Sequence, residues 1–117
     1  MGKKDLNRIR HMVEAAVAVL HHIEKKQESD LESDRLLLGG VIRELLLIGE
    51  AANAISHEVQ QQYPDIPWKQ MIGMRNQLIH GYFDINYQII WNTVTKDIPK
   101  LLKHLQKILQ SFELTSL

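Results

Sequence analysis

The sequence predicts an all-α protein, built as an antiparallel bundle of four or five helices. Apolar residues recur at steps of three and four along most of the 117 residues, which is the period of helices with a buried face, whereas no stretch alternates as a strand does. The content of 44% hydrophobic and 24% charged residues is that of an ordinary globular protein, and the length predicts a single domain over residues 1–117.

Two long helices are expected in the first half of the chain. The first covers about residues 5–26, and a polar connection over residues 27–34 leads to a second helix with apolar positions over residues 38–59. The pair Gly39-Gly40 is expected to interrupt this second helix near its start. The second helix is also apolar on more than one side, which a small bundle does not need, so we expect a partner subunit to cover it in a homodimer.

Two further helices are expected in the second half. The first covers residues 67–80 with a proline in its first turn, where a missing N–H costs little, and Gly81 is a natural left-handed stop. Asp84 or Asn86 is expected to cap the last helix. Pro99 lies inside that last helix and should bend it about one turn before the proline.

Composition disfavours several functional classes. The absence of cysteine excludes disulfides and thiolate metal sites. The N-terminus lacks the apolar segment of a signal peptide, and no apolar run approaches the roughly 20 residues that cross a bilayer, so a cytoplasmic protein without membrane contact is expected. The formal net charge is 0, whereas general nucleic-acid binders are usually basic. Any RNA contact must therefore come from local patches. One candidate patch is a row of lysines on the last helix, although most such rows are solvated faces: Lys96, Lys100, Lys103 and Lys107.

The end of the third predicted helix carries the candidate chemistry, in the pattern Arg-x-x-x-x-His-x-Tyr. On a helical wheel at about 100° per residue, Arg75 falls inside the apolar arc, whereas Asn76 and His80 lie beyond its edge and close together. An arginine in an apolar arc needs an anionic partner. Two interpretations stay open, namely an internal salt bridge to Glu50 or Glu44, or a cleft in which Arg75 binds phosphate.

The other motif residues each have a chemical and a structural interpretation. The negative end of the helix favours a protonated His80, which suits a general acid for the leaving 5′ oxygen in RNA cleavage, but this histidine could also simply cap its helix. Asn76 could orient His80 or bind phosphate, or be solvated. Tyr82 could stack on a base or be modified, or be a boundary aromatic. The remaining histidines have no partner at ligand spacing, so no metal is expected.

The motif resembles the signature of the HEPN superfamily, and specifically that of HepT-like toxins. Further blocks in the same order support the resemblance, which covers most of the chain from about residue 36 to residue 109. The blocks are Ile48–Ala52, Pro64–Trp68, Gly73–Phe83, Trp91 and Asp97–Leu101.

This resemblance implies a metal-independent endoribonuclease without a cofactor, whose active site forms across a homodimer. Arg75 and His80 would be the catalytic pair, Asn76 would support them, and Glu50 is a possible further supporting residue. The resemblance also implies a toxin role. An MntA-like minimal nucleotidyltransferase would be the antitoxin and would transfer AMP to the motif tyrosine, Tyr82.

Two alternatives to an RNA-cleaving toxin stay open. The chain could be a non-catalytic helical partner or regulatory subunit of a nucleotidyltransferase, in which Arg75 forms an interface salt bridge and Tyr82 packs. It could also be a nucleotide- or RNA-binding module without turnover.

Overall fold

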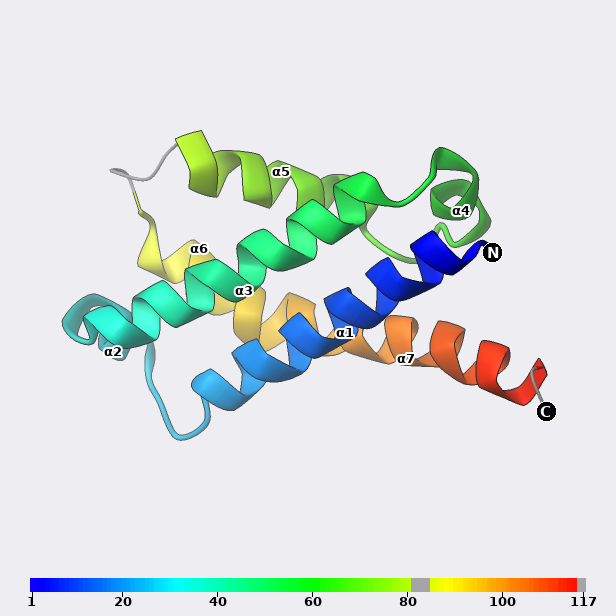
Figure 1. The fold of residues 1–117 in the computed structure, drawn as a ribbon. Helices are drawn as coiled ribbons and strands as arrows, with labels where there is room; N and C mark the ends of the chain where they lie inside the picture. The colour runs from blue at the N-terminus through cyan, green and yellow to red at the C-terminus, as the bar shows by residue number, and fades with distance from the viewer. Residues whose placement is uncertain (81–84, 116–117) are drawn as a thin grey trace.

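The computed structural model describes residues 1–80 and 85–115, with side chains as far as residue 112, and this part of the chain is all-α. Four long helices alternate in direction as an antiparallel bundle, which confirms the predicted fold class (Figure 1). They are α1 Lys3–His22, α3 Arg35–Ala54, α5 Trp68–His80 and α7 Ile98–Thr115. Three short helices and a π-helical turn join them, namely α2 Glu28–Ser33, α4 His57–Gln62, α6 Tyr87–Asn92 and η1 Thr93–Asp97. None of the helices in the described residues is long and apolar enough to cross a bilayer.

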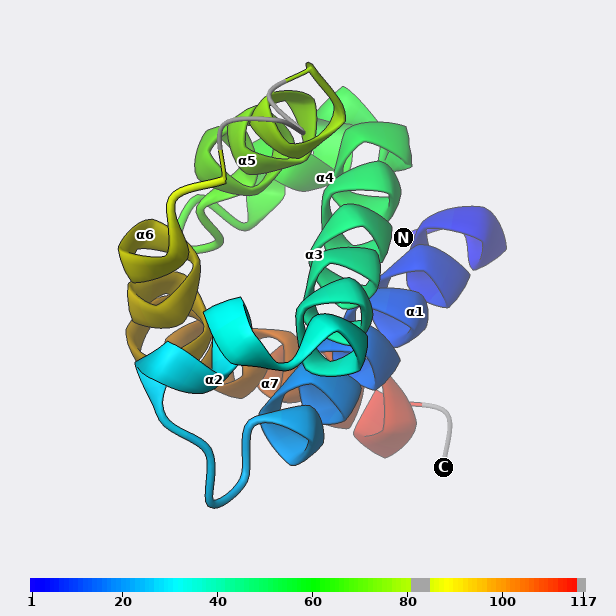
Figure 2. The same ribbon diagram turned by 90° about the vertical axis from the view of Figure 1, so that its left-hand side faces the viewer.

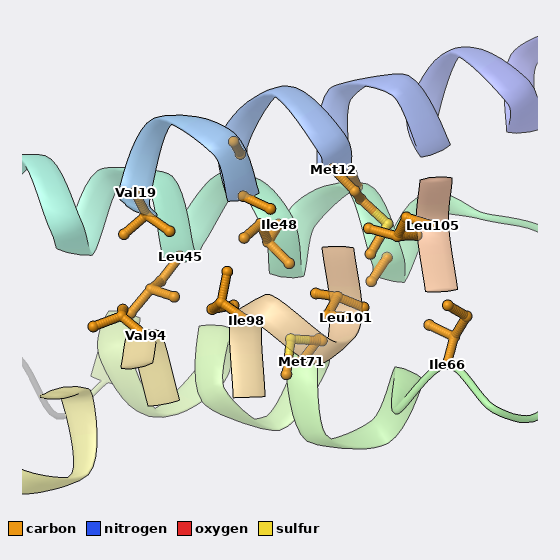
Figure 3. Packing of buried hydrophobic residues seen from close by; sticks show 14 of the residues in the cluster. Met12, Val19, Leu45, Ile48, Ile66, Met71, Val94, Ile98, Leu101 and Leu105 are labelled. Carbon is orange, nitrogen blue, oxygen red and sulfur yellow. The ribbon is translucent and has the colours of Figure 1, made fainter. Parts of the chain in front are cut away.

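Helix α3 lies at the centre of the bundle. It packs against α1 on one side and α5 on another, while α7 packs against α1 (Figure 2). Buried side chains from all four long helices meet in one apolar core (Figure 3). Those with the least exposure include Met12, Leu45, Ile48, Met71, Ile98, Leu101 and Leu105. The three-and-four spacing of apolar residues therefore faces the interior as the sequence predicts.

The predicted interruption at Gly39-Gly40 is wrong, because α3 continues through both glycines. A glycine inside a helix costs only about 1 kcal/mol relative to alanine, which the packing of neighbouring turns offsets. Gly40 also lies beside α1, where an added Cβ would come 3.4 Å from the ring of His22. The first helix ends at His22, before the expected end near residue 26.

The second helix does not extend to Val59 as predicted. Helix α3 ends at Ala54, and a separate helix, α4, begins at His57. Ser56 is the cap of α4, and its hydroxyl accepts a hydrogen bond from the Val59 N–H at 3.3 Å. The Asp5 carboxylate accepts hydrogen bonds from the Ser56 N–H at 3.0 Å and the Ser56 hydroxyl at 2.8 Å. The bond from the backbone N–H lowers the pKa of Asp5. The start of α1 thus fixes the place where α3 ends.

The irregularity predicted before Pro99 is the π-helical turn η1. Proline has no N–H to donate to the carbonyl of Thr95, so the regular ladder is interrupted one turn earlier. The Thr93 hydroxyl donates to the Ile89 carbonyl at 2.8 Å, and the Thr95 hydroxyl donates to the Trp91 carbonyl at 2.7 Å. Upstream, the Asn86 side chain caps α6, which confirms one of the two caps expected there.

A close approach between α3 and α5 occurs at Gly49. A Cβ added at Gly49 would overlap the Cβ of Arg75 and lie 2.9 Å from the Met71 carbonyl oxygen. The Met71 oxygen belongs to the backbone of α5, so it can move away from an added Cβ only if the whole helix moves. Only glycine therefore allows α5 to lie at this distance from α3.

We expect Gly49→Ala to lower the free energy of unfolding by about 1–3 kcal/mol, because the added methyl forces the two helices apart. Gly39→Ala is the matched control, since Gly39 is in the same helix and nothing lies within 4 Å of an added Cβ. That control should be stabilised by about 0.5–1 kcal/mol through its helix propensity. Urea unfolding followed by circular dichroism measures both variants. Equal effects of the two substitutions would contradict the close approach.

Candidate active site

Arg75 is held against α3 by an ion pair with Glu50. Its Nε and Nη2 donate to the same Glu50 carboxylate oxygen at 2.8 and 2.7 Å, and its Nη1 donates to the Asn76 side-chain oxygen at 2.8 Å. Of the two carboxylates that the sequence offered as partners, Glu50 is thus the one that pairs with Arg75. Glu44 is nearly buried and lies 3.3 Å from Arg43 instead.

The Arg75 guanidinium keeps binding capacity in this arrangement. It has five N–H donors, of which three are used by Glu50 and Asn76, so two remain available within the described structure. The Arg75 side chain is 25% exposed and that of Glu50 is 52% exposed. An anion from solvent can therefore approach the guanidinium and compete with Glu50 for it. This arrangement suits the binding of a phosphate.

His80 lies in the last turn of α5 and is exposed. It lines a cavity of about 510 Å³, together with Met74 and Gln77 from α5, Ile42 from α3 and Asn86 from the start of α6. Arg75 does not line this cavity. Five residues at about 100° each place Arg75 and His80 about 140° apart around the helix, so one faces α3 and the other faces α6. The described part of one chain does not bring the two side chains into one pocket.

Asn76 contacts Arg75, and no hydrogen bond joins it to His80 within the described residues. Its amide oxygen accepts from the guanidinium, which orients Arg75. Tyr82 lies outside the described residues, as do Gly81 and Asp84, which were predicted as a helix stop and a cap. No group of three or more potential metal ligands occurs in the part of the chain that the structure describes.

A second hollow, of about 600 Å³, lies between α1 and α3 and includes Glu50. Its lining includes small or apolar side chains, among them Ala15, Ala51 and Leu47. The lining also carries basic and acidic groups in similar number, namely Arg8, His11 and Arg43 against Glu14, Glu44 and Glu50, of which Glu44 is buried. Leu47 is 44% exposed here, in agreement with the excess apolar surface predicted for this helix.

The residues that line the His80 cavity from other helices were not found from the sequence. Asn86 was recognised only as a cap, and Ile42 only as a core position. The spacing of Met74, Gln77 and His80 at steps of three does place them on one face of α5, and this signal could have identified Gln77 as a neighbour of His80.

Residues 6–108 match the sequence profile of the HepT-like ribonucleases. The chain belongs to this family. The match covers most of the chain and confirms the family that the motif and the neighbouring blocks indicated.

Individual relatives agree with the family match. A candidate RNase of Caldanaerobacter subterraneus subsp. tengcongensis is 35% identical over 102 residues, which cover 87% of this chain and 91% of the relative. A candidate RNase of Methanocaldococcus jannaschii is 34% identical over 107 residues, or 91% of this chain and 98% of the relative. A protein of Thermococcus cleftensis named as a probable ribonuclease HepT is 39% identical over 79 residues, which cover 68% of this chain and 72% of the relative. No solved structure shows a significant match.

We expect Glu50→Gln to change the free energy of unfolding by less than about 1 kcal/mol, because partly exposed ion pairs contribute little to stability. Glu58→Gln, at an exposed position on α4, is the control for removing one negative charge. Urea unfolding of both variants measures the difference. A loss of several kcal/mol at Glu50 alone would show that the pair is a structural support and not an exchangeable contact.

Proposed function

We propose that this HepT-like chain is a metal-independent endoribonuclease that acts as the toxin of a toxin–antitoxin pair. The observation that carries the proposal is the placement of an accessible guanidinium, Arg75, and an exposed imidazole, His80, on one helix of a chain from a ribonuclease family. Phosphate binding and proton transfer are the two tasks that cleavage of RNA requires of a protein, because RNA carries its own nucleophile.

In the proposed reaction, the ribose 2′-OH attacks the adjacent phosphorus and the bond to the 5′ oxygen breaks. The products are a 2′,3′-cyclic phosphate and a 5′-OH. Protonated His80 gives its proton to the leaving 5′ oxygen, while an imidazole from a second copy of the motif accepts the 2′-OH proton. Arg75 stabilises the negative charge that develops on the phosphorane, and Asn76 holds the guanidinium in place.

The site is proposed to form across a homodimer, because one chain places Arg75 and His80 on different sides of α5. The hollow between α1 and α3 supports a self-complementary contact. In a two-fold pair, the exposed basic residues of its lining would meet exposed acidic residues of the other copy, beside apolar side chains such as Leu47. Glu50 belongs to this hollow and also binds Arg75, so pairing here would place both Glu50–Arg75 ion pairs next to the interface.

We expect His80→Ala to lower the rate of RNA cleavage by about 10²–10⁴-fold, because it removes the proton donor. His57→Ala is the control, since His57 is an exposed histidine on α4. Purified proteins are compared on a labelled RNA in the presence of EDTA, and light scattering reports the oligomeric state. Intact RNA with the unmodified chain, or loss of cleavage on adding EDTA, would contradict the proposal. A monomer at micromolar concentration would contradict the composite site.

We further propose that an MntA-like nucleotidyltransferase antitoxin inhibits the enzyme by adenylylating Tyr82. Tyr82 follows His80 by two residues in the sequence. An AMP group attached there adds bulk and negative charge close in sequence to the proton donor. Both effects oppose the binding of a substrate phosphate.

After co-expression with such an antitoxin, we expect the intact mass to increase by one or more adenylyl groups. Tyr82→Phe should prevent this increase, because no phenolic oxygen remains to accept the AMP. Tyr87→Phe, on α6, is the control for the loss of a tyrosine hydroxyl. An unchanged mass in the parent protein, or an equal gain in Tyr82→Phe, would overturn the regulatory part of the proposal.

The second candidate function is a non-catalytic partner of a nucleotidyltransferase. The ion pair between Arg75 and Glu50 favours it, because this guanidinium already has an internal partner. The cleavage assay on the isolated chain separates the two functions. Identical, inactive behaviour of the parent and His80→Ala would favour the partner role.

A further inference from the structure

A groove with the chemistry of a base-binding site runs along the side of α5 that faces α6 and η1. The cavity beside His80 adjoins a second one of about 420 Å³, and the two share four lining residues, namely Met74, Gln77, Ile89 and Thr93. Together they extend from His80 at one end to Gln70 and Asp97 at the other. The groove is therefore continuous with the candidate active site.

The groove exists because α5 has one strong neighbour only. It packs closely on α3, whereas it makes few contacts with α6 and η1. In Figure 2, α5 lies at the top, α6 at the left and α3 to the right of this region. A hydrogen bond from the Gln70 amide to the Asp97 carboxylate, at 3.0 Å, joins α5 to η1 at the far end.

The groove lining is mainly apolar between its two ends, where the ionisable side chains of His80 and Asp97 lie. Ile42, Met74 and Ile90 supply apolar surface, and Ile89 does so while 56% exposed. No lysine or arginine lines either cavity among the described residues. The stretch between His80 and Asp97 thus has no cationic side chain to bind a phosphate. It suits a flat, uncharged ligand with hydrogen-bonding edges, and an unpaired nucleobase has these properties.

Two lining amides, those of Gln77 and Asn92, have no hydrogen bond among the described residues, and of these only Gln77 lines both cavities. The Asn86 side-chain oxygen accepts from the Ile89 N–H at 3.1 Å, and the Thr93 hydroxyl donates to the Ile89 carbonyl at 2.8 Å, so both serve the backbone. The Gln77 amide has no hydrogen bond within the described structure, and it lies in the stretch that both cavities share. A primary amide offers a donor and an acceptor side by side, which matches the edge of a base.

We propose that this groove binds unpaired bases of the RNA next to the bond that is cut, and that Gln77 reads the edge of one of them. The inference rests on the proposed ribonuclease function. His80 lines the same cavity as Gln77, three residues away on the same helix, so a ribose–phosphate at His80 places its neighbouring base at the groove. Gln77 determines specificity and takes no part in proton transfer.

The test separates binding from cleavage by using His80→Ala, which cannot turn over its ligand. Short labelled oligomers of A, C, G and U are titrated with this protein by fluorescence anisotropy. One base should bind at least about fivefold more tightly than the others, because one good amide–base pair gives roughly 1–3 kcal/mol of discrimination. Adding Gln77→Leu should bring the four affinities together. Adding Gln106→Leu, at an exposed glutamine on α7, should preserve the preference.

A second variant tests the groove at another position, and its folding is checked separately. Ile89→Asp places a carboxylate in the groove at an exposed position and should weaken all four oligomers, while the thermal unfolding temperature shows whether the fold is retained. In the active protein, Gln77→Leu should change the preferred cleavage position and raise KM more than it lowers kcat.

The outcomes distinguish this inference from the proposed function. If the parent protein cleaves RNA and Gln77→Leu keeps the same base preference, the inference about the groove is wrong and the ribonuclease proposal stands. If the base preference in binding depends on Gln77 but the parent protein does not cleave RNA, the base-binding groove is supported and the proposed enzymatic activity is wrong. If Gln77→Leu weakens binding of the antitoxin protein and leaves the RNA preference intact, the groove is a protein contact and the inference is wrong.

Discussion

The contact between α3 and α5 at Gly49 is the constraint on which the site depends. Because position 49 has no side chain, α5 lies close enough for the Arg75 guanidinium to reach Glu50 on the next residue of α3. The rotation of α5 is then fixed, and the remaining faces of this helix follow from it. Gln77 and His80 are directed to the side where α6 and η1 leave a groove. A single glycine thus decides which motif residue faces which neighbour.

The two chemical groups of the motif are separated by the geometry of the helix that carries them. A separation of about 140° around one helix cannot be closed by side-chain rotation without disturbing the ion pair with Glu50. The pair itself is partly exposed, and such pairs contribute little free energy to folding. An anion that competes for Arg75 would therefore displace the Glu50 carboxylate at low cost to the fold. The ion pair holds the Arg75 side chain in place when no anion is bound, and an anion can take the place of the Glu50 carboxylate.

The sequence predicted those features that depend on local periodicity. The all-α class, the extent of α5 and the cap at Asn86 follow from spacing and helix-end chemistry within one segment. The motif also identified Arg75 and offered Glu50 as its partner, because an arginine in an apolar arc requires an anion. The family was evident from several blocks of sequence in the same order, and residues 6–108 match its profile.

Other features depend on residues that are distant in sequence, and they were missed for that reason. The break at Ser56 is stabilised by Asp5, which lies 51 positions earlier. Gly39-Gly40 stays helical because the intrinsic cost of glycine is smaller than the gain from packing α3 into the core. The groove depends on how far α6 stands from α5, and no pattern within either helix encodes that distance.

The π-helical turn η1 has a consequence for the shape of this groove. A wide turn accommodates one residue more than an α-helical turn, so it shifts the phase of everything upstream by about 100° relative to α7. Ile89 and Thr93 lie before or at the start of this turn, and Asp97 at its end pairs with Gln70. Were the turn regularised by deleting one residue, α7 could stay seated in the core while Ile89 rotated away from α5. The extra residue of η1 sets how α6, which forms the wall beside His80, is rotated relative to α7, which completes the core.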